Sequence, residues 1–427
     1  MSQLAPSAGP SPRDRWMGLL AAFLGWMFDG LEMGIFPIIS RPALTSMFKA
    51  QGIVDDKIIE GMVGQWNGNI GACFLIGAAL GGFTFGWLGD KIGRVKAMSF
   101  SILTYSVFSG LCYFAQDQWQ LGGLRCVAAL GMGGEWSLGV ALVMELWDGK
   151  HRWLLAAAIG AAVNLGFALI AAITAFGWKV DESSWRWVML IGALPALLTF
   201  FIRLFVPESH HWQAAQDKAA EKGEKINPLR EIFQPNLIRM TFTAIVLASI
   251  PQIGTWGSIS NIVPWVDKLS GGTHPEYKSY SQLCSSIGSA FGCFFGTWLA
   301  HVSGRRIAFF GLCFCSLVLS QILFRTFTEF NTAFMVMVFF IGFFASSFYG
   351  WLPLYLPELF PTRVRATGQG LGYNTARIFS AIGSVYMGGF VKDWGWAKTC
   401  GTVAFIYGLG MIVIWFAPET KGKELPE

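Results

Sequence analysis

Charged residues are scarce in this chain of 427 amino acids, at 13% of the total against 53% hydrophobic residues. Soluble domains carry about 25% charged residues, so the surface of this protein has to face an apolar medium. The net charge of +5 is small and spread along the chain. Because no basic stripe is present, nucleic acid is not an expected partner.

Patterns typical of metal sites and of catalysis are also missing. The eight cysteines lie almost entirely inside apolar runs and form no CxxC pair with further ligands, so they are expected to be small buried hydrophobic residues. The five histidines fall between apolar runs or at their ends. No nucleophile–base pair stands out. We therefore expect no metal, no cofactor and no enzymatic activity.

Long hydrophobic runs dominate instead. A helix needs about 20 apolar residues to cross roughly 30 Å of hydrocarbon, and the chain contains twelve such stretches. The first contains Asp29 and Glu32 and lacks a cleavage site of small residues, so it is a retained span and not a signal peptide. The expected spans are 16–40, 62–88, 97–115, 120–144, 153–177, 187–206, 240–265, 279–300, 306–324, 331–355, 367–390 and 397–417.

Lysine and arginine predict the orientation. With both termini in the cytoplasm, 19 of these residues fall in inner segments and 10 in outer segments, and the reverse would violate the positive-inside rule. We predict an all-α, multi-pass protein of the cell membrane, embedded in the lipid bilayer and monomeric. Its expected parts are a disordered cytoplasmic tail (1–15), a six-helix half (16–206), a cytoplasmic linker (207–239), a second six-helix half (240–417) and a short tail (418–427).

The two halves repeat each other weakly, at offsets of 211 to 213 residues. This symmetry predicts two pseudo-symmetric halves of six transmembrane helices, with a substrate site between them near the bilayer midplane. The repeated pairs are Gly93-Arg94 with Gly304-Arg305, Pro207-Glu208 with Pro418-Glu419, and Glu145 and Arg152 with Glu358 and Arg365.

The loop Gly-Trp-Leu-Gly-Asp-Lys-Ile-Gly-Arg-Val-Lys at 86–96 resembles the signature loop of the major facilitator superfamily. Asp90 and Arg94 are four residues apart and can pair, and Asp90 can accept hydrogen bonds from the N-terminus of a neighbouring helix. Gly86 and Gly93 let helix ends approach closely. His301 stands where the second half would repeat Asp90, so a weaker latch is expected there. The residues predicted to gate the cytoplasmic side are Asp90, Arg94, Gly86, Gly93, Glu145, Arg152, Glu358 and Arg365.

Further segments over residues 13–425 support the same resemblance. They point to its proton-linked metabolite, sugar-acid, aromatic-acid and sialic-acid carriers. The segments are Asp29-Gly30-Leu31-Glu32, the stretch from Arg125 to Glu135, Pro207-Glu208-Ser209, the run from Leu356 to Arg365 continuing to Asn374 and Arg377, and Pro418-Glu419-Thr420-Lys421-Gly422.

Five ionisable residues lie within the expected spans, where charge is costly and therefore points to function. Asp29 and Glu135 are the predicted proton-coupling acids, with Glu32 as a third, because burial disfavours a charged carboxyl group and a nearby arginine favours it. Arg377, and Arg125 with it, could bind a carboxylate. Mutual pairing that only holds helices together is the alternative for all five. Polar and aromatic candidates for substrate contact are Asn374, Gln65, Asn67, Gln252, Trp256, Asn261 and Tyr373.

The leading hypothesis is secondary active transport of a small organic anion, such as a monocarboxylate, sugar acid, sialic acid or aromatic acid, in symport with protons by alternating access. Its partners would be that small molecule and protons. A sugar or polyol porter, a proton-driven exporter of drugs or metabolites, and a non-transporting sensor remain as alternatives. Arg377 favours an anion over a sugar, and the lack of a large soluble domain argues against the sensor.

Overall fold

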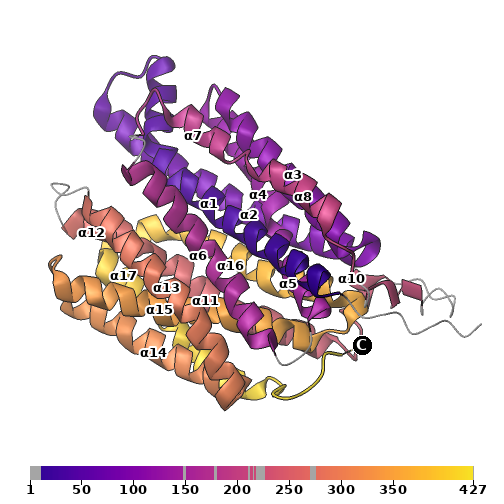
Figure 1. Cartoon of the computed structure of the whole chain (residues 1–427). Helices are drawn as coiled ribbons and strands as arrows, with labels where there is room; N and C mark the ends of the chain where they lie inside the picture. Colours follow the sequence, from indigo (N-terminus) through magenta and orange to yellow (C-terminus); the bar gives the residue numbers. More distant parts are fainter. Residues whose placement is uncertain are drawn as a thin grey trace, which may run out of the picture.

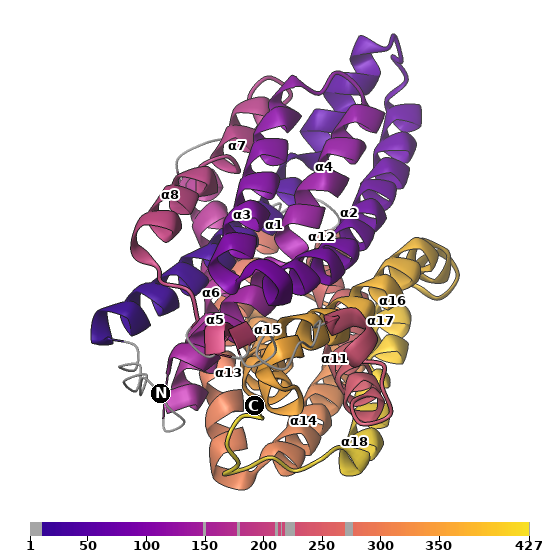
Figure 2. The same cartoon turned by 90° about the vertical axis from the view of Figure 1, so that its right-hand side faces the viewer.

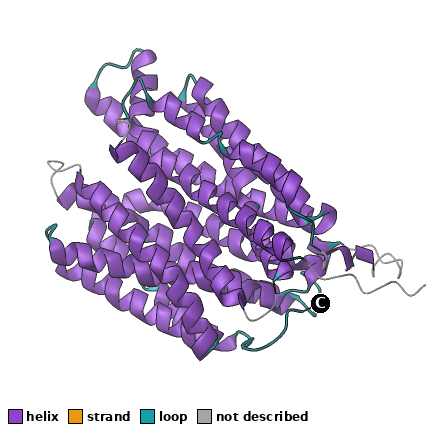
Figure 3. Ribbon diagram, in the orientation of Figure 1, coloured by secondary structure: helices purple, strands orange, loops and turns teal. Residues whose placement is uncertain are grey.

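The computed structural model describes residues 11–147, 151–176, 180–209, 212–214, 216–217, 227–269 and 276–426. In this part of the chain every regular element is a helix and no strand occurs (Figure 3). The predicted all-α fold is confirmed. Residues 1–10 of the predicted tail, and 210–211, 215 and 218–226 of the predicted linker, lie outside the described residues.

The helices follow the predicted spans in order. Those of the first half are α1 (Pro12–Ala50), α2 (Asp56–Ile92), α3 (Arg94–Leu111), η1 (Cys112–Phe114), α4 (Gln118–Gly133), α5 (Glu135–Leu146), α6 (Arg152–Phe176), α7 (Trp185–Ile191) and α8 (Pro195–Phe205). Those after it are α10 (Pro228–Glu231), α11 (Ile238–Gly257), η3 (Ile259–Asn261), α12 (Ile262–Leu269), α13 (Glu276–Ser303), α14 (Arg305–Thr326), α15 (Thr332–Tyr355), η4 (Leu356–Leu359), η5 (Thr362–Val364), α16 (Arg365–Trp394), α17 (Trp396–Val403), α18 (Ile406–Val413) and η6 (Ile414–Phe416).

Ten helical stretches in the described residues are long and apolar enough to cross a membrane. The two other predicted spans have local reasons for falling short. The sixth is broken into α7 and α8 by a turn before Pro195, which lacks the N–H that would continue a helix. The eleventh, α16, is continuous but carries Gln369, Asn374 and Arg377 in its apolar sequence.

Capping side chains explain where several helices begin. Ser11 and Asp14 form a reciprocal capping box at the start of α1. The helix therefore begins at Pro12, and the prediction that residues 12–15 belong to a disordered tail was wrong. Asp55, Asp117 and Asn331 accept backbone N–H bonds at the starts of α2, α4 and α15.

Two bundles lie side by side, one formed by the helices up to α8 and the other by those from α11 onward (Figure 1). Across the boundary α6 lies along α13 and α15, and α2 lies along α16. The Trp147 indole donates to the carbonyl of Arg15 (3.0 Å), and Arg365 donates to the carbonyl of Pro426 (2.8 Å). Because Arg365 also pairs with Glu145, both chain ends lie at one end of the bundle, here named the terminal end (Figure 2).

Near the terminal end α2 packs closely against α16, and the two helices separate towards the opposite end. On α2, a Cβ atom at Gly82 would collide with Asn374 of α16, and one at Gly86 would meet the backbone of Ala366. Gly64 and Gly68 precede these two glycines by eighteen residues, which is five helical turns, so they lie on the same face. At both positions none of the described atoms lies within 4 Å of a Cβ. The face of α2 that packs against α16 is therefore open further along.

Gly166 of α6 controls the approach of this helix to α1. A Cβ atom there would overlap the backbone of Met27 and Leu31. We expect Gly166→Leu to destabilise the folded protein by about 3 kcal/mol or more, because main chain cannot move aside as a flexible side chain can. Gly311→Leu in α14 is the matched control, since no atom of the described residues lies within 4 Å of its Cβ position. The monodisperse fraction and thermal midpoint of both variants test this, and equal values would contradict it.

Candidate functional site

A buried charge network joins the two halves at the terminal end. Arg94, at the start of α3, pairs with Asp90 at 2.6 Å and with Glu145 of α5 at 3.1 Å. It also donates across the boundary to the carbonyl of Thr362 at 2.7 Å. Glu145 in turn pairs with Arg365 of α16 at 3.0 Å. The pairing predicted for Asp90 and Arg94 is therefore present, and it continues into the second half.

Asp90 also caps a helix of the other half, as its sequence context predicted. α16 begins at Arg365 and has no side-chain cap of its own. Asp90 accepts the backbone N–H of Ala366 at 3.3 Å and of Thr367 at 2.7 Å, and the Thr367 hydroxyl at 2.5 Å. A carboxylate at a helix N-terminus is stabilised by the unpaired N–H groups there.

The second half repeats this arrangement with one change. Gly93 and Gly304, both with positive φ, precede α3 and α14, and Glu208 and Glu419 accept the N–H of the arginine that follows each glycine. His301, in the place of Asp90, stacks on Trp153 of α6 with ring centroids 5.7 Å apart.

Arg305, the counterpart of Arg94, forms an ion pair with Glu358. The two side chains form hydrogen bonds of 2.6 and 3.1 Å. Arg152, at the start of α6, is close enough for its charge to act on Glu358 from the first half. The charge of Arg152 thus acts on a glutamate of the other half, as does that of Arg365 on Glu145, with which Arg365 forms a close ion pair at 3.0 Å.

Two acids meet near the middle of the first half. Asp29 of α1 and Glu135 of α5 are buried side by side, at a separation at which one can hydrogen-bond the other when protonated. Gly25, one turn before Asp29, makes room for the Glu135 carboxyl group, which a Cβ there would displace. Among the described residues no other group donates to either oxygen of Glu135 or to Oδ1 of Asp29.

Residues of α16 approach these acids from the second half. Arg377 donates to Oδ1 of Asn374 at 2.9 Å and lies over the Tyr373 ring, 5.2 Å from its centroid. The charge of Arg377 acts on Asp29. Asn374 donates to the carbonyl of Gly133 at 3.3 Å and lies against Gly82 of α2, just before α2 and α16 separate. Arg377, one turn further along α16, lies at the start of that separation.

Glu32 and Arg125 form an ion pair within the first half. Both side chains are buried, and the Ser109 hydroxyl donates to the same Glu32 oxygen at 2.5 Å. The Arg125 guanidinium also lies over the rings of Phe36 and Phe74, at 5.1 and 4.9 Å from their centroids. This geometry corresponds to the structural alternative considered for the two residues, because each charge has its partner inside one half.

The remaining candidates fall into two groups. Gln252 of α11 is buried, accepts a hydrogen bond from the Trp256 indole at 3.0 Å and interacts with Tyr373. It therefore adjoins the α16 residues described above. Asn261 lies further along and donates to the carbonyl of Trp256 at 3.2 Å. Gln65 and Asn67 are exposed on the part of α2 that has separated from α16, and so do not join the cluster.

The structure adds residues that the sequence did not indicate. Trp136 stacks on Tyr373 with ring centroids 4.0 Å apart, and thereby joins α5 to α16. Its position next to Glu135 was the one available signal. Ser209 donates to Glu145, and Thr367 binds Asp90. Ser209 belongs to the motif Pro207-Glu208-Ser209 and Thr367 lies two residues after Arg365, but a serine or threonine near a helix end is too common to indicate this contact with an acid.

Two packed helical bundles with charges buried between them define a polytopic membrane transporter. The family model described as "Major Facilitator Superfamily" matches residues 16–371 and again 247–427. The chain belongs to this superfamily, which consists of membrane transporters and not of enzymes.

Known relatives cover nearly the same length. The cis,cis-muconate transport protein of Acinetobacter baylyi is 29% identical over 377 residues, covering 87% of this chain and 86% of the relative. The sialic acid transporter NanX of Escherichia coli is 27% identical over 377 residues and 87% of each chain. The solved structure of the proton:xylose symporter XylE with 6-bromo-6-deoxy-D-glucose has a TM-score of 0.76 at 17% identity, over 96% of this chain and 98% of that one. At that identity the likeness concerns the fold.

Replacing Asp90 should loosen the terminal end. In Asp90→Asn a neutral amide loses the ion pair with Arg94 and one acceptor oxygen for the start of α16. Breaking a buried pair costs about 3–5 kcal/mol, so we expect the terminal end to open more often. Spin labels at Lys96→Cys and Arg363→Cys, with the native cysteines replaced by serine, report the distance between the halves.

The control for this experiment is Glu182→Gln, which removes the exposed pair with Lys49. It should leave the label distances unchanged. An unaltered distance distribution in Asp90→Asn would show that the charge network does not hold the terminal end closed.

Proposed function

We propose that this chain is a symporter that carries a small organic anion into the cell together with protons, by alternating access. The observation that carries the proposal is the meeting of Asp29 and Glu135 from the first half with Arg377 from the second, at the point where the halves separate. Charges at such a position contact whatever occupies the space between the halves.

The two acids can couple protons because they are adjacent. Like charges in a buried site repel, so a pair of neighbouring carboxyl groups is stable when it holds a proton. Arg377 favours loss of that proton. A substrate carboxylate bound to Arg377 would weaken this influence, and binding of the anion would thereby favour binding of the proton. The two binding events reinforce each other, as symport requires.

An organic acid fits the site better than a neutral sugar. A buried guanidinium offers a planar pair of donors that matches a carboxylate, and a sugar gives it no charge partner. The relatives named for cis,cis-muconate and for sialic acid transport carboxylates. Trp136 and Tyr373 stack on each other beside Arg377 and give the guanidinium an apolar setting. We therefore favour a small carboxylate.

Orientation follows from the distribution of positive charge. The terminal end carries the lysine- and arginine-rich segments, which supports a cytoplasmic position for this end and the cell membrane as the location of the protein. The separated end then faces outwards, ready to receive substrate. Inward release requires the charge network of Asp90, Arg94, Glu145 and Arg365 to break as the halves rock. We propose these residues, with Arg152 and Glu358, as the cytoplasmic gate.

Arg377→Ala should abolish binding of the carboxylate substrate. Hydrogen bonds to a charged group contribute about 1.5–3 kcal/mol each, so losing two weakens binding by at least about a hundredfold. Arg377→Lys should restore binding only in part, because a point charge cannot donate in parallel to both oxygens. Thermal-shift titration with a panel of organic acids measures this. If the alanine variant binds as tightly as wild type, Arg377 is a structural residue.

Asp29→Asn and Glu135→Gln should separate transport from the proton gradient. Each keeps one position permanently neutral, so the carrier no longer needs to bind and release a proton. We expect uptake driven by an inward proton gradient to stop, while exchange of internal for external substrate continues. Radiolabelled uptake and counterflow in proteoliposomes measure the two activities.

The wild type and the protonophore provide the controls for that experiment. Accumulation by the wild type should collapse when the protonophore is added, and a misfolded variant would lose exchange as well as accumulation. If both neutral variants still accumulate substrate at the wild-type level, these acids do not carry the proton. Glu32 would then be the remaining acid, although its pairing with Arg125 disfavours it.

A further inference from the structure

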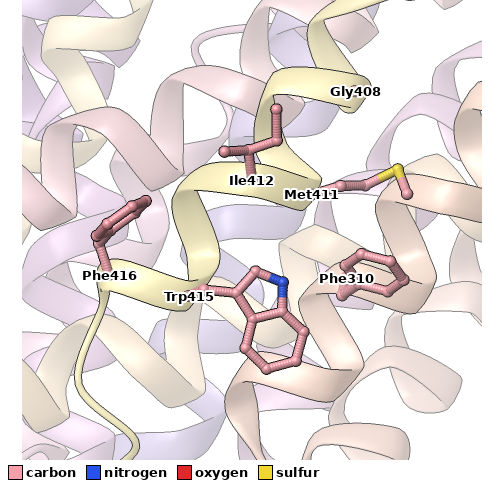
Figure 4. A pocket seen from close by; sticks show the side chains of 6 residues that line it. All are labelled: Phe310, Gly408, Met411, Ile412, Trp415 and Phe416. Atoms are coloured by element: carbon pink, nitrogen blue, oxygen red, sulfur yellow. The ribbon is translucent and has the colours of Figure 1, made fainter.

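An apolar groove opens on the flank of the second bundle, between α14 and α18. It is lined by Phe310, Gly408, Met411, Ile412, Trp415 and Phe416 (Figure 4). Its volume of about 620 Å³ lies within the range of about 300–1,000 Å³ usual for small-molecule sites. Gly408 keeps the wall open, because among the described residues a Cβ atom there would have only Leu317 nearby, at 3.9 Å.

The groove faces the surrounding membrane. Ile412, Trp415 and Phe416 are 62%, 50% and 72% exposed, which apolar side chains tolerate when lipid covers them. From Phe416 to Gly408 the groove follows the helix for about 12 Å, at 1.5 Å per residue. Trp415 lies against Phe310 with ring centroids 5.8 Å apart. Tryptophan is enriched where hydrocarbon meets the polar headgroups, which identifies the Trp415 end as the interfacial end.

Two arginines border that interfacial end. Arg306 donates from Nε to the carbonyl of Ala417 at 2.7 Å, and Arg239 donates to the carbonyl of Phe416 at 3.3 Å. A guanidinium group carries five N–H donors, and each of the two contacts uses one donor of its arginine. The others are suited to phosphate oxygens, which arginine binds through parallel hydrogen bonds.

Glu419 lies at the same end and is negatively charged, but its hydrogen bonds come from backbone N–H groups and not from the two guanidinium groups. Burial alone would raise the pKa of Glu419, but hydrogen bonds from backbone N–H groups bring it below its usual value. The carboxylate thus accepts hydrogen bonds from the first residues of α14 and from the two residues that follow Glu419 in the chain. The exposed side chain of Lys421 adds a further positive charge nearby. The N–H groups belong to Arg305, Arg306, Thr420 and Lys421, at 3.0–3.1 Å.

We propose that the groove binds one anionic phospholipid from the leaflet at the terminal end. An acyl chain lies from Phe416 to Gly408, and the phosphate lies between Arg239 and Arg306. Apolar lining beside a basic border complements the two parts of such a lipid, and juxtamembrane arginines attract anionic headgroups. A zwitterionic lipid gains less from the same residues, because its headgroup has no net charge.

Native mass spectrometry of the full chain in detergent tests the proposal. We expect one phosphatidylglycerol to be retained in preference to phosphatidylcholine. Arg239→Gln should weaken its binding by about tenfold, since one charge-assisted contact is lost. Gly408→Leu should abolish it by filling the groove. Arg230→Gln, which removes an exposed arginine of α10 at the same end of the bundle, is the control and should bind as wild type does.

Other occupants of the groove give different spectra. Equal retention of the two lipids, or unchanged retention in Arg239→Gln, would overturn the proposal. Inorganic phosphate should not displace the lipid, and displacement would mean an anion site without an acyl chain. A dimer that disappears in Gly408→Leu would mean that a second copy of the chain covers the groove. That result too would refute lipid binding.

Discussion

The contact between the two halves at the terminal end depends on the buried guanidinium group of Arg94, which needs hydrogen-bond acceptors. Its guanidinium is removed from water, so an unpaired charge would cost several kcal/mol. The acceptors come from both halves: Asp90 and Glu145 on one side, the carbonyl of Thr362 on the other. While they are in place the terminal end stays closed. At the opposite end α2 separates from α16, and Gln65 and Asn67 are exposed there.

Buried charges in this protein are of two kinds, which differ in the sign of the neighbouring charge. In the charge network and in the pair of Glu32 with Arg125, oppositely charged partners lie together. Asp29 and Glu135 instead are two acids that lie beside each other. A pair of opposite charges stabilises one arrangement of helices. Two adjacent carboxyl groups are open to a proton and to the influence of a ligand, which is what a coupling site needs.

The first turn of α14 connects the interior of the second half with its lipid-facing flank. Arg305 turns inwards to Glu358, while its neighbour Arg306 turns to the carbonyl of Ala417 at the border of the groove. Glu419 holds the N–H groups of both residues. A lipid at the groove would therefore share a rigid support with residues that meet the first half through Arg152.

Hydrophobic length, internal repeats and short spacings determined the class of this protein from sequence alone. Twelve apolar runs specify membrane helices, and the repeat of Gly93-Arg94 at Gly304-Arg305 specifies two halves. The pairing of Asp90 with Arg94 needs only helical geometry over four residues. Each of these features is a short pattern of neighbouring residues, so it can be recognised in the sequence without knowledge of the fold.

Tertiary structure alone decided which distant residues meet. Arg125 lies 93 positions from the glutamate that neutralises it, and Arg94 reaches a carbonyl 268 positions away. Asp29 and Glu32 are only three residues apart, and their spacing did not indicate that Glu32 would pair with Arg125 while Asp29 would lie beside Glu135. The groove of α14 and α18 was equally hidden. Such contacts depend on how closely helices cross, which Gly25, Gly82 and Gly133 set by admitting a neighbouring side chain or backbone where a Cβ would exclude it.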